Sequence, residues 1–297
     1  MSIALPKIGF RKVAAASAVA VATAGLSVLV VAPAAQAQSA DLNYTCGVPL
    51  LGDKTFIVSS DTNSPATVPA GKSFVPRVTA TVTIPADVAS VITGTLKATT
   101  AEGSAQVSTL VNGATKTVSM TIPKTTIPSG ALPVAASGNG AAIKAGNAGT
   151  TIKMAASSFT SHLVLKKADG SPADLMSEID VACTLQPDQD ASVDTVKVVK
   201  AASTTRATVA YSKARKRAIA TATVKGAYGN RATGSVRFVL KKGTKVVKRL
   251  TAKVNSRGVA RSTFTRVKAR GAYSLQSTYL GNRNLKGSAK VVKFRVR

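Results

Sequence analysis

Several residue types are scarce or absent in this sequence. Its 297 residues include no tryptophan, one histidine and two cysteines, and it has 12 acidic residues against 40 lysines and arginines. Two cysteines and one histidine fall short of a zinc site, so we expect no metal and no cofactor. The few aromatic residues and the lack of a DNA-reading helix motif disfavour sequence-specific nucleic acid as a partner. What the chain does have in excess is positive charge.

The N-terminus has the pattern of an export signal. Lys7, Arg11 and Lys12 precede an apolar run over residues 13–31, and Ala-Gln-Ala at positions 35–37 fits a small-x-small cleavage site. We expect residues 1–37 to be a cleaved signal peptide, with retention as a membrane anchor as the alternative. No sorting motif or hydrophobic tail follows. These features predict a secreted, extracellular protein that is associated with the cell wall.

The charge changes abruptly along the remaining chain. Residues 38–194 hold 10 basic and 12 acidic residues, whereas residues 195–297 hold 27 basic and no acidic residues. Such a step predicts a domain boundary and a polyanionic partner for one part only. We therefore expect a first domain over 38–187, a linker over 188–202 and a basic domain over 203–297.

The two cysteines, Cys46 and Cys183, lie near the two ends of the expected first domain. Exported proteins tolerate disulfides, and an even count suits one bridge. We expect a Cys46–Cys183 disulfide that closes this domain, and two free buried thiols are the alternative.

The composition favours β structure. Thr, Val, Ala, Ser and Gly dominate, and segments such as 77–84 and 116–122 alternate between polar and apolar residues. Residues 85–91, with Pro85 in the first turn, are expected to form one short helix. Residues 123–149 are expected to be mostly loop, with strand fragments as the alternative. The fold class that we predict is all-β, with two tandem β-sandwich domains after the signal peptide.

The basic domain shows seven strand candidates at roughly ten-residue spacing, which is typical of an immunoglobulin-like sandwich. They are residues 207–211, 218–226, 234–241, 244–254, 258–266, 271–279 and 289–296. Crossover helices of the length that a parallel sheet needs are missing.

Both parts of the chain resemble known families. Residues 232–238 (ATGSVRF), 258–260 (GVA) and 271–282 (GAYSLQSTYLGN) resemble the bacterial Ig-like repeat domains of surface and secreted proteins, although Asn282 stands where Asp is common. That resemblance implies an immunoglobulin-like fold. Residues 42–46 (LNYTC) and 181–185 (VACTL) are similar to an uncharacterised secreted domain of high-GC Gram-positive bacteria, which implies no activity.

No residues form a recognisable catalytic set. His162 is the only histidine, and the sequence has no G-x-S-x-G motif that would supply it with a serine nucleophile. Glu178 and Asp180 are two residues apart, as paired carboxylates can be in glycosidases, but nothing else in the segment indicates a sugar site. We expect no catalytic residues and a protein that is not an enzyme. A secreted hydrolase with a site in the first domain is kept as an alternative.

The basic residues are the strongest functional signal. A charge of +27 within 103 residues is costly in self-repulsion, and an extended anion would relieve it. We predict an anionic cell-wall polymer or glycan as the partner, with a membrane surface as an alternative ligand and a spacer or an adhesin that binds a protein as alternative roles. The expected polyanion-binding residues are Lys213, Arg215, Lys216, Arg217, Lys241, Lys242, Lys245, Lys248, Arg249, Lys293, Arg295 and Arg297.

Overall fold

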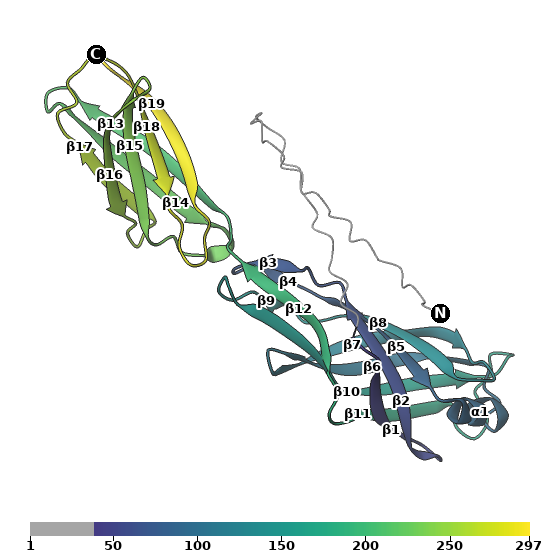
Figure 1. The fold of residues 1–297 in the computed structure, drawn as a ribbon. Helices are drawn as coiled ribbons and strands as arrows, with labels where there is room; N and C mark the ends of the chain where they lie inside the picture. The colour runs from purple at the N-terminus through teal and green to yellow at the C-terminus, as the bar shows by residue number, and fades with distance from the viewer. Residues whose placement is uncertain (1–38) are drawn as a thin grey trace, which may run out of the picture. The chain divides into compact units, whose positions relative to one another are not determined.

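The computed structural model describes residues 39–297, so the predicted signal peptide lies outside the described residues. The described chain is mostly β structure with one short α-helix and one 3-10 turn, Ala227–Gly229 (Figure 1). The helix is α1 (Ala86–Gly94), which confirms the predicted short helix but ends three residues later and has Pro85 at its N-cap position, not in its first turn. None of the helices between residues 39 and 297 has the length and apolar character that crossing a membrane requires.

The first part of the chain is built on a ten-stranded sheet, in which eight strands close into a ring. In order around the ring these are β11 (Glu178–Leu185), β1 (Leu42–Val48), β2 (Gly52–Thr62), β5 (Arg77–Ile84), β8 (Leu132–Asn139), β7 (Ala114–Thr126), β6 (Thr100–Val111) and β10 (Thr151–Lys166). The ring closes because β10 also pairs with β11, through Phe159↔Cys183 to Val164↔Glu178. All of these pairings are antiparallel, so the eight strands form a β-barrel (Figure 1).

The barrel is formed because alternate residues of each strand are apolar and face its interior. In β5, for example, Val78 and Ile84 are buried while Arg77 and Thr79 are exposed. One buried core takes in side chains from all eight strands and from α1. The helix contributes Val88 and Ile92, because apolar residues spaced four apart lie on one helix face.

The barrel corrects the expectation of a sandwich in this part of the chain. A sandwich has two sheets with open edges, whereas here the first and last strands of the ring are hydrogen-bonded. Two further strands, β12 (Ser192–Val199) and β3 (Thr67–Pro69), continue the sheet beyond β10, and β4 (Ser73–Phe74) pairs with β9 (Ile143–Lys144). A second small core underlies them; its buried residues are Val68, Ala70, Ile143, Ala145, Ile152, Met154, Val196 and Val198.

Three local expectations also differ from the structure. The range 123–149, expected as loop, contains β8 and β9, because Leu132 and Val134 are buried beside β5. Strand β6 was not expected, because its sequence has few strongly apolar residues. The range 188–202, expected as linker, contains β12, whose Val196 and Val198 are buried.

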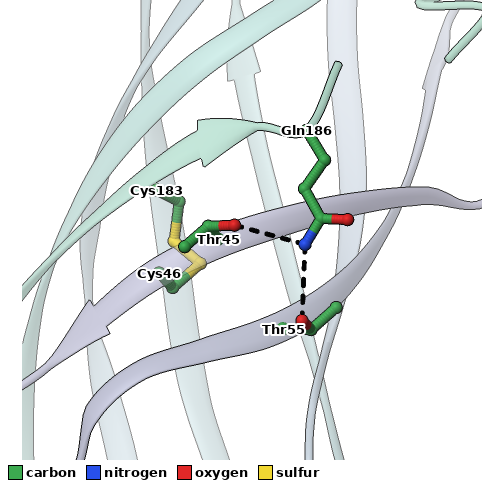
Figure 2. Close-up of a disulfide and its surroundings, with 5 residues drawn as sticks. All are labelled: Thr45, Cys46, Thr55, Cys183 and Gln186. Carbon is green, nitrogen blue, oxygen red and sulfur yellow. Dashed lines mark hydrogen bonds between the residues drawn. A yellow bond between two sulfur atoms is a disulfide. The ribbon is translucent and has the colours of Figure 1, made fainter. Parts of the chain in front are cut away.

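Cys46 and Cys183 form the predicted disulfide. They are directly opposed on β1 and β11, and both are buried. Figure 2 shows that Gln186, just after β11, reaches across this seam. Its Nε2 donates to Oγ1 of Thr45 at 3.2 Å and to Oγ1 of Thr55 on β2 at 3.4 Å. The covalent bond and these hydrogen bonds fasten the first strand of the barrel to the last.

The basic part of the chain consists of two antiparallel sheets. One has the order β13 (Ser203–Ser212), β14 (Arg217–Gly226) and β17 (Val259–Phe264). The other has the order β16 (Lys245–Lys253), β15 (Ser235–Lys242), β18 (Gly271–Tyr279) and β19 (Ser288–Val296). Residues from both sheets share one core, in which Phe238, Phe264 and Tyr279 are almost fully buried. All seven strands were predicted, six of them to within one or two residues at each end and β13 with a later start than the structure has.

Candidate functional site

The basic side chains of residues 203–297 lie on the surface of these two sheets. This segment holds 25 lysines and arginines and no acidic residue, and all but Arg217 and Lys241 are well exposed. The alternation of the strands causes this, because apolar positions such as Phe238 and Leu240 take the inner face. Positive charge therefore lies on the surface of this part of the chain and not in its core.

The topology brings three loops and the C-terminal residues together at one end of the two sheets. The loop 265–270 is tied to the turn 213–216, because Val267 N donates to Lys216 O at 2.9 Å. It is also tied to β18, where Tyr273 Oη donates to Ala269 O at 2.8 Å. These three segments therefore meet.

The β15–β16 hairpin and the end of β19 reach the same end. Lys242 is opposite Tyr273, and Gly271 is opposite Val296. The C-terminus marks this end in Figure 1. We call its exposed cations the basic end, which comprises Lys213, Arg215, Lys216, Lys242, Lys245, Arg266, Lys268, Arg270, Arg295 and Arg297.

Seven of the twelve predicted polyanion-binding residues belong to the basic end, and five lie elsewhere. Lys241 and Lys293 are on the outer face of the four-stranded sheet, where both are opposite Ser274. Lys248 and Arg249 are adjacent on β16, so they point to opposite faces. Arg217 starts β14, is half-buried, and has a buried Nε with no hydrogen-bond partner among the described residues.

Sequence reasoning missed Arg266, Lys268 and Arg270. Their alternation with Val267 and Ala269 was a signal, but Arg266 ended one predicted strand, and Lys268 and Arg270 lay between that strand and the next. Only the hydrogen bonds of the loop 265–270 place these side chains beside the turn 213–216.

A shallow hollow lies next to the basic end. Its volume is about 470 Å³, and Lys293 and Arg295 of β19 line it together with Gly243 of the β15–β16 hairpin. Phe294, between the two cations, stacks on Tyr273 with ring centroids 5.5 Å apart. The rings of Tyr273 and Phe294 therefore line the hollow. Lys293 and Arg295, the residues before and after Phe294 on β19, line it as well.

Within residues 39–297 the cations of the basic part form no ion pair. All five ion pairs join residues between Lys54 and Asp180, and none involves a residue beyond that range. Electrostatic repulsion within the basic part is therefore not offset by internal pairs. An external anion would lower it.

Three acidic residues lie just before the basic part, and two of them accept hydrogen bonds within the first part of the chain. Asp194 is buried and accepts a hydrogen bond from Thr62 Oγ1 at 2.6 Å. Asp190 accepts from the backbone of Ser192 at 3.0 Å, and hydrogen bonds from that serine, its hydroxyl first, lower the pKa of the Asp190 carboxyl. Asp188 takes part in no ion pair among the described residues.

The structure also brings together the residues weighed for catalysis. His162 on β10 lies opposite Asp180 on β11 and opposite Ser104 on β6. The distance from His162 Nδ1 to Asp180 Oδ1 is 2.8 Å, and that from Nε2 to Glu178 Oε2 is 4.0 Å. The carboxylates therefore face the same way, as their spacing predicted.

This row lies on the outer wall of the barrel and is open to solvent. The side chains of His162 and Asp180 are 45% and 86% exposed. Strand β10 has a hydrogen-bonded neighbour on each side at His162, so its backbone N–H groups serve the ladder. The row thus places an imidazole beside two carboxylates. The backbone N–H groups of β10 around it are engaged in the sheet and are not free to stabilise an oxyanion.

Comparison with known proteins places the first part of the chain in a family. Residues 43–194, just over half of the chain, match the family of unknown function DUF6801, and the protein belongs to that family. This agrees with the resemblance to an uncharacterised domain, and the family brings no activity with it. No curated relative matches the chain.

Two solved structures show a distant likeness. A "putative membrane anchored protein" from Corynebacterium diphtheriae is similar over 86% of this chain and 58% of its own, with 16% identity and a TM-score of 0.38. A "putative beta-galactosidase" from Bacteroides fragilis is similar over 78% of this chain and 34% of its own, with 10% identity and a TM-score of 0.24. The chain thus spans less than two thirds of either protein.

Proposed function

We propose that this is an exported, non-enzymatic protein of the bacterial envelope whose basic, immunoglobulin-like domain binds an anionic wall or membrane polymer. The observation that carries the proposal is the basic end, where ten exposed cations come together and no acidic residue of this domain lies near them. The disulfide supports export, because such bonds are typical of proteins outside the reducing cytoplasm.

Binding would be electrostatic. Each pairing of a cation with a phosphate or carboxylate of the polymer releases a counterion, so affinity falls steeply as salt rises. Several loops at one end suit an extended ligand better than a single small anion, because their cations are spread over separate segments. The hollow beside Lys293 and Arg295 offers a further position for one anionic group.

The proposal is tested by retention on isolated Gram-positive cell walls and by titration with linear inorganic polyphosphate across a salt gradient. The variant Arg215→Glu/Lys268→Glu/Arg270→Glu reverses three charges at the basic end. We expect it to lower the slope of log affinity against log salt by about 1 for each phosphate that the variant no longer binds.

A matched control is Arg231→Glu/Arg283→Glu/Lys286→Glu. These residues lie at the other end of the two sheets, where Asn282 Nδ2 donates to Arg231 O at 3.1 Å. Both variants have the same net charge, so equal reductions in affinity would mean that total charge, and not the basic end, governs binding.

The alternatives give different results. A spacer would stay in the supernatant at low salt, and an adhesin would bind one protein ligand with little dependence on salt. A secreted hydrolase would turn over envelope esters or glycans, and that turnover would be abolished by His162→Ala.

A further inference from the structure

The barrel is not completely filled. Its interior contains a cavity of about 120 Å³. An eight-stranded barrel either fills its interior with side chains or holds one small ligand. Here several inward positions carry small residues, among them Ala80, Ala105 and Ala136. Val82 and Val107 face the same space and keep part of their surface accessible, so the small residues leave room that their neighbours do not occupy.

The cavity wall is almost entirely apolar. Of the polar residues that line it, Thr62 donates its hydroxyl to Asp194, and Thr109 donates to Lys116 O at 3.2 Å. Among residues 39–297, the buried side-chain atoms that lack a partner are Asp61 Oδ1, Arg217 Nε and Ser277 Oγ, and none of these residues lines the cavity. The cavity therefore offers mainly apolar contact and no buried, unpaired side-chain atom to orient a polar ligand; Lys116 and Ser161 also line it but are not buried.

The size and apolar lining of such a space favour an apolar ligand over water. A water molecule needs two to four polar partners, and an apolar cavity of about 150 Å³ in another protein stays dry and binds benzene. The walls here are mainly aliphatic and belong to a closed barrel, so their chemistry suits a hydrocarbon chain.

Two exposed leucines lie at the end of the barrel that α1 covers. Leu50, which also lines the cavity, is 71% exposed in the β1–β2 turn, and Leu175 is 84% exposed in the loop before β11. Contacts near each leucine place both at this end. Lys54, which follows the turn with Leu50, pairs with Asp87 of α1 at 2.7 Å. Asp174, next to Leu175, donates its N–H to the carbonyl oxygen of Leu96, just after α1, at 2.9 Å.

Both leucines have left-handed backbones, with φ of 68° at Leu50 and 59° at Leu175. That conformation is costly for a non-glycine residue and persists only where the surroundings impose it, often at ligand sites. Leu50 therefore lines the cavity while most of its side chain stays in solvent, where an apolar chain that enters would cover it; Leu175 lies at the same end but does not line the cavity.

We propose that the barrel of this protein is a lipid-binding module that takes up one straight hydrocarbon chain of a fatty acid or lipid into the cavity, past Leu50 at the α1 end. The polar head group stays outside. This site is separate from the basic end and does not depend on the function proposed for it.

Binding is measured on the full-length chain with a series of straight-chain fatty acids from butanoate to dodecanoate, and with dodecanol as the uncharged partner of dodecanoate. Each added methylene should strengthen binding about fourfold until the cavity is full. Dodecanoate and dodecanol should bind within a few-fold of each other, because the head group lies outside. An affinity that does not change with chain length would overturn the proposal.

A second readout adds no bulk to the cavity. Tyr44 lines the cavity and is the only tyrosine between residues 39 and 199. A bromine-labelled fatty acid should therefore quench part of the tyrosine fluorescence, and Tyr44→Phe should remove that part. Quenching that persists in Tyr44→Phe would place the chain outside the barrel.

A pair of variants locates the chain. Ala80→Leu adds bulk inside the cavity, whereas Thr79→Leu adds the same side chain to the outer face of β5, because neighbouring strand residues point to opposite sides. We expect Ala80→Leu to weaken dodecanoate binding at least tenfold and Thr79→Leu to leave it unchanged. Equal weakening by both variants would contradict the proposal. If Ala80→Leu does not fold, the chain-length series and the quenching of Tyr44 still decide.

Discussion

Removal of the Cys46–Cys183 disulfide should destabilise the barrel strongly. The bond joins residues 137 apart in sequence and ties β1 to β11 at the seam where the ring closes. In the folded state these strands are also held by backbone hydrogen bonds, so reduction leaves the native pairing available. Its main effect is on the unfolded chain, which gains freedom when the cross-link is removed.

The size of the effect follows from the length of the closed loop. For a loop of 137 residues the chain-entropy relation gives about 5 kcal/mol, and measured values are often lower, so we expect about 3–5 kcal/mol. With an m-value of about 2 kcal/mol/M in urea, the unfolding midpoint should fall by about 1.5–2.5 M.

The assay is hydrogen exchange with mass spectrometry across a urea series, comparing the protein with Cys46→Ala/Cys183→Ala. Peptides from residues 39–199 should lose protection at lower urea. Peptides from 203–297 contain no cysteine and serve as an internal control. Thr45→Ala/Thr184→Ala alters the neighbouring cross-strand pair on the outer face and should cost about 1 kcal/mol. If the double-alanine variant unfolds within about 1 kcal/mol of the wild type, the loop-entropy reasoning is wrong.

Three further changes test the packing of the barrel. Gly103→Ala should cost more than about 2 kcal/mol, because its Cβ would collide with the carbonyl oxygen of His162; Gly130→Ala, with open space, should change the free energy of unfolding by less than about 0.5 kcal/mol. Asp194→Ala should cost about 2 kcal/mol because it removes the acceptor of the Thr62 hydroxyl, whereas the exposed Asp188→Ala should be nearly neutral in urea unfolding. Burial raises the pKa of Tyr44 to about 12, so the neutral phenol is favoured in the folded state. The stability that this contributes is complete below about pH 10, the usual tyrosine pKa, and is lost as pH rises to about 12, a fall of about 2–3 kcal/mol. Tyr44→Phe should lack that part of the decline, and an identical pH profile for the two proteins would contradict the assignment.

Much of the local structure followed from the sequence. Strand β5 occupies the residues that its alternation predicted, and α1 follows Pro85 as expected. The segments that were missed, β6 and β8, contain glycine and small or polar residues. Their place in the sheet is decided by neighbours: β6 lies between β7 and β10, and β8 lies beside β5.

The candidate sites depended more heavily on tertiary structure. The strand residues of the basic part were assigned to faces by alternation alone, but the convergence of loops 213–216 and 265–270 is set by the Val267–Lys216 hydrogen bond. The cavity could not be predicted, because small residues such as Ala80 and Ala136 are common in any strand, and only the ring places them around one space.

By itself the sequence determined the β class, the disulfide and the separation of charge, since these depend on local alternation, on two cysteines and on composition. Only the tertiary structure decided that the first sheet closes into a barrel, that its interior is hollow, and that ten cations share one end. The physical reason is that strand pairing joins residues far apart in the chain. Strand β10 could pair with β6, β11 and β12 only once folding had brought all of them together.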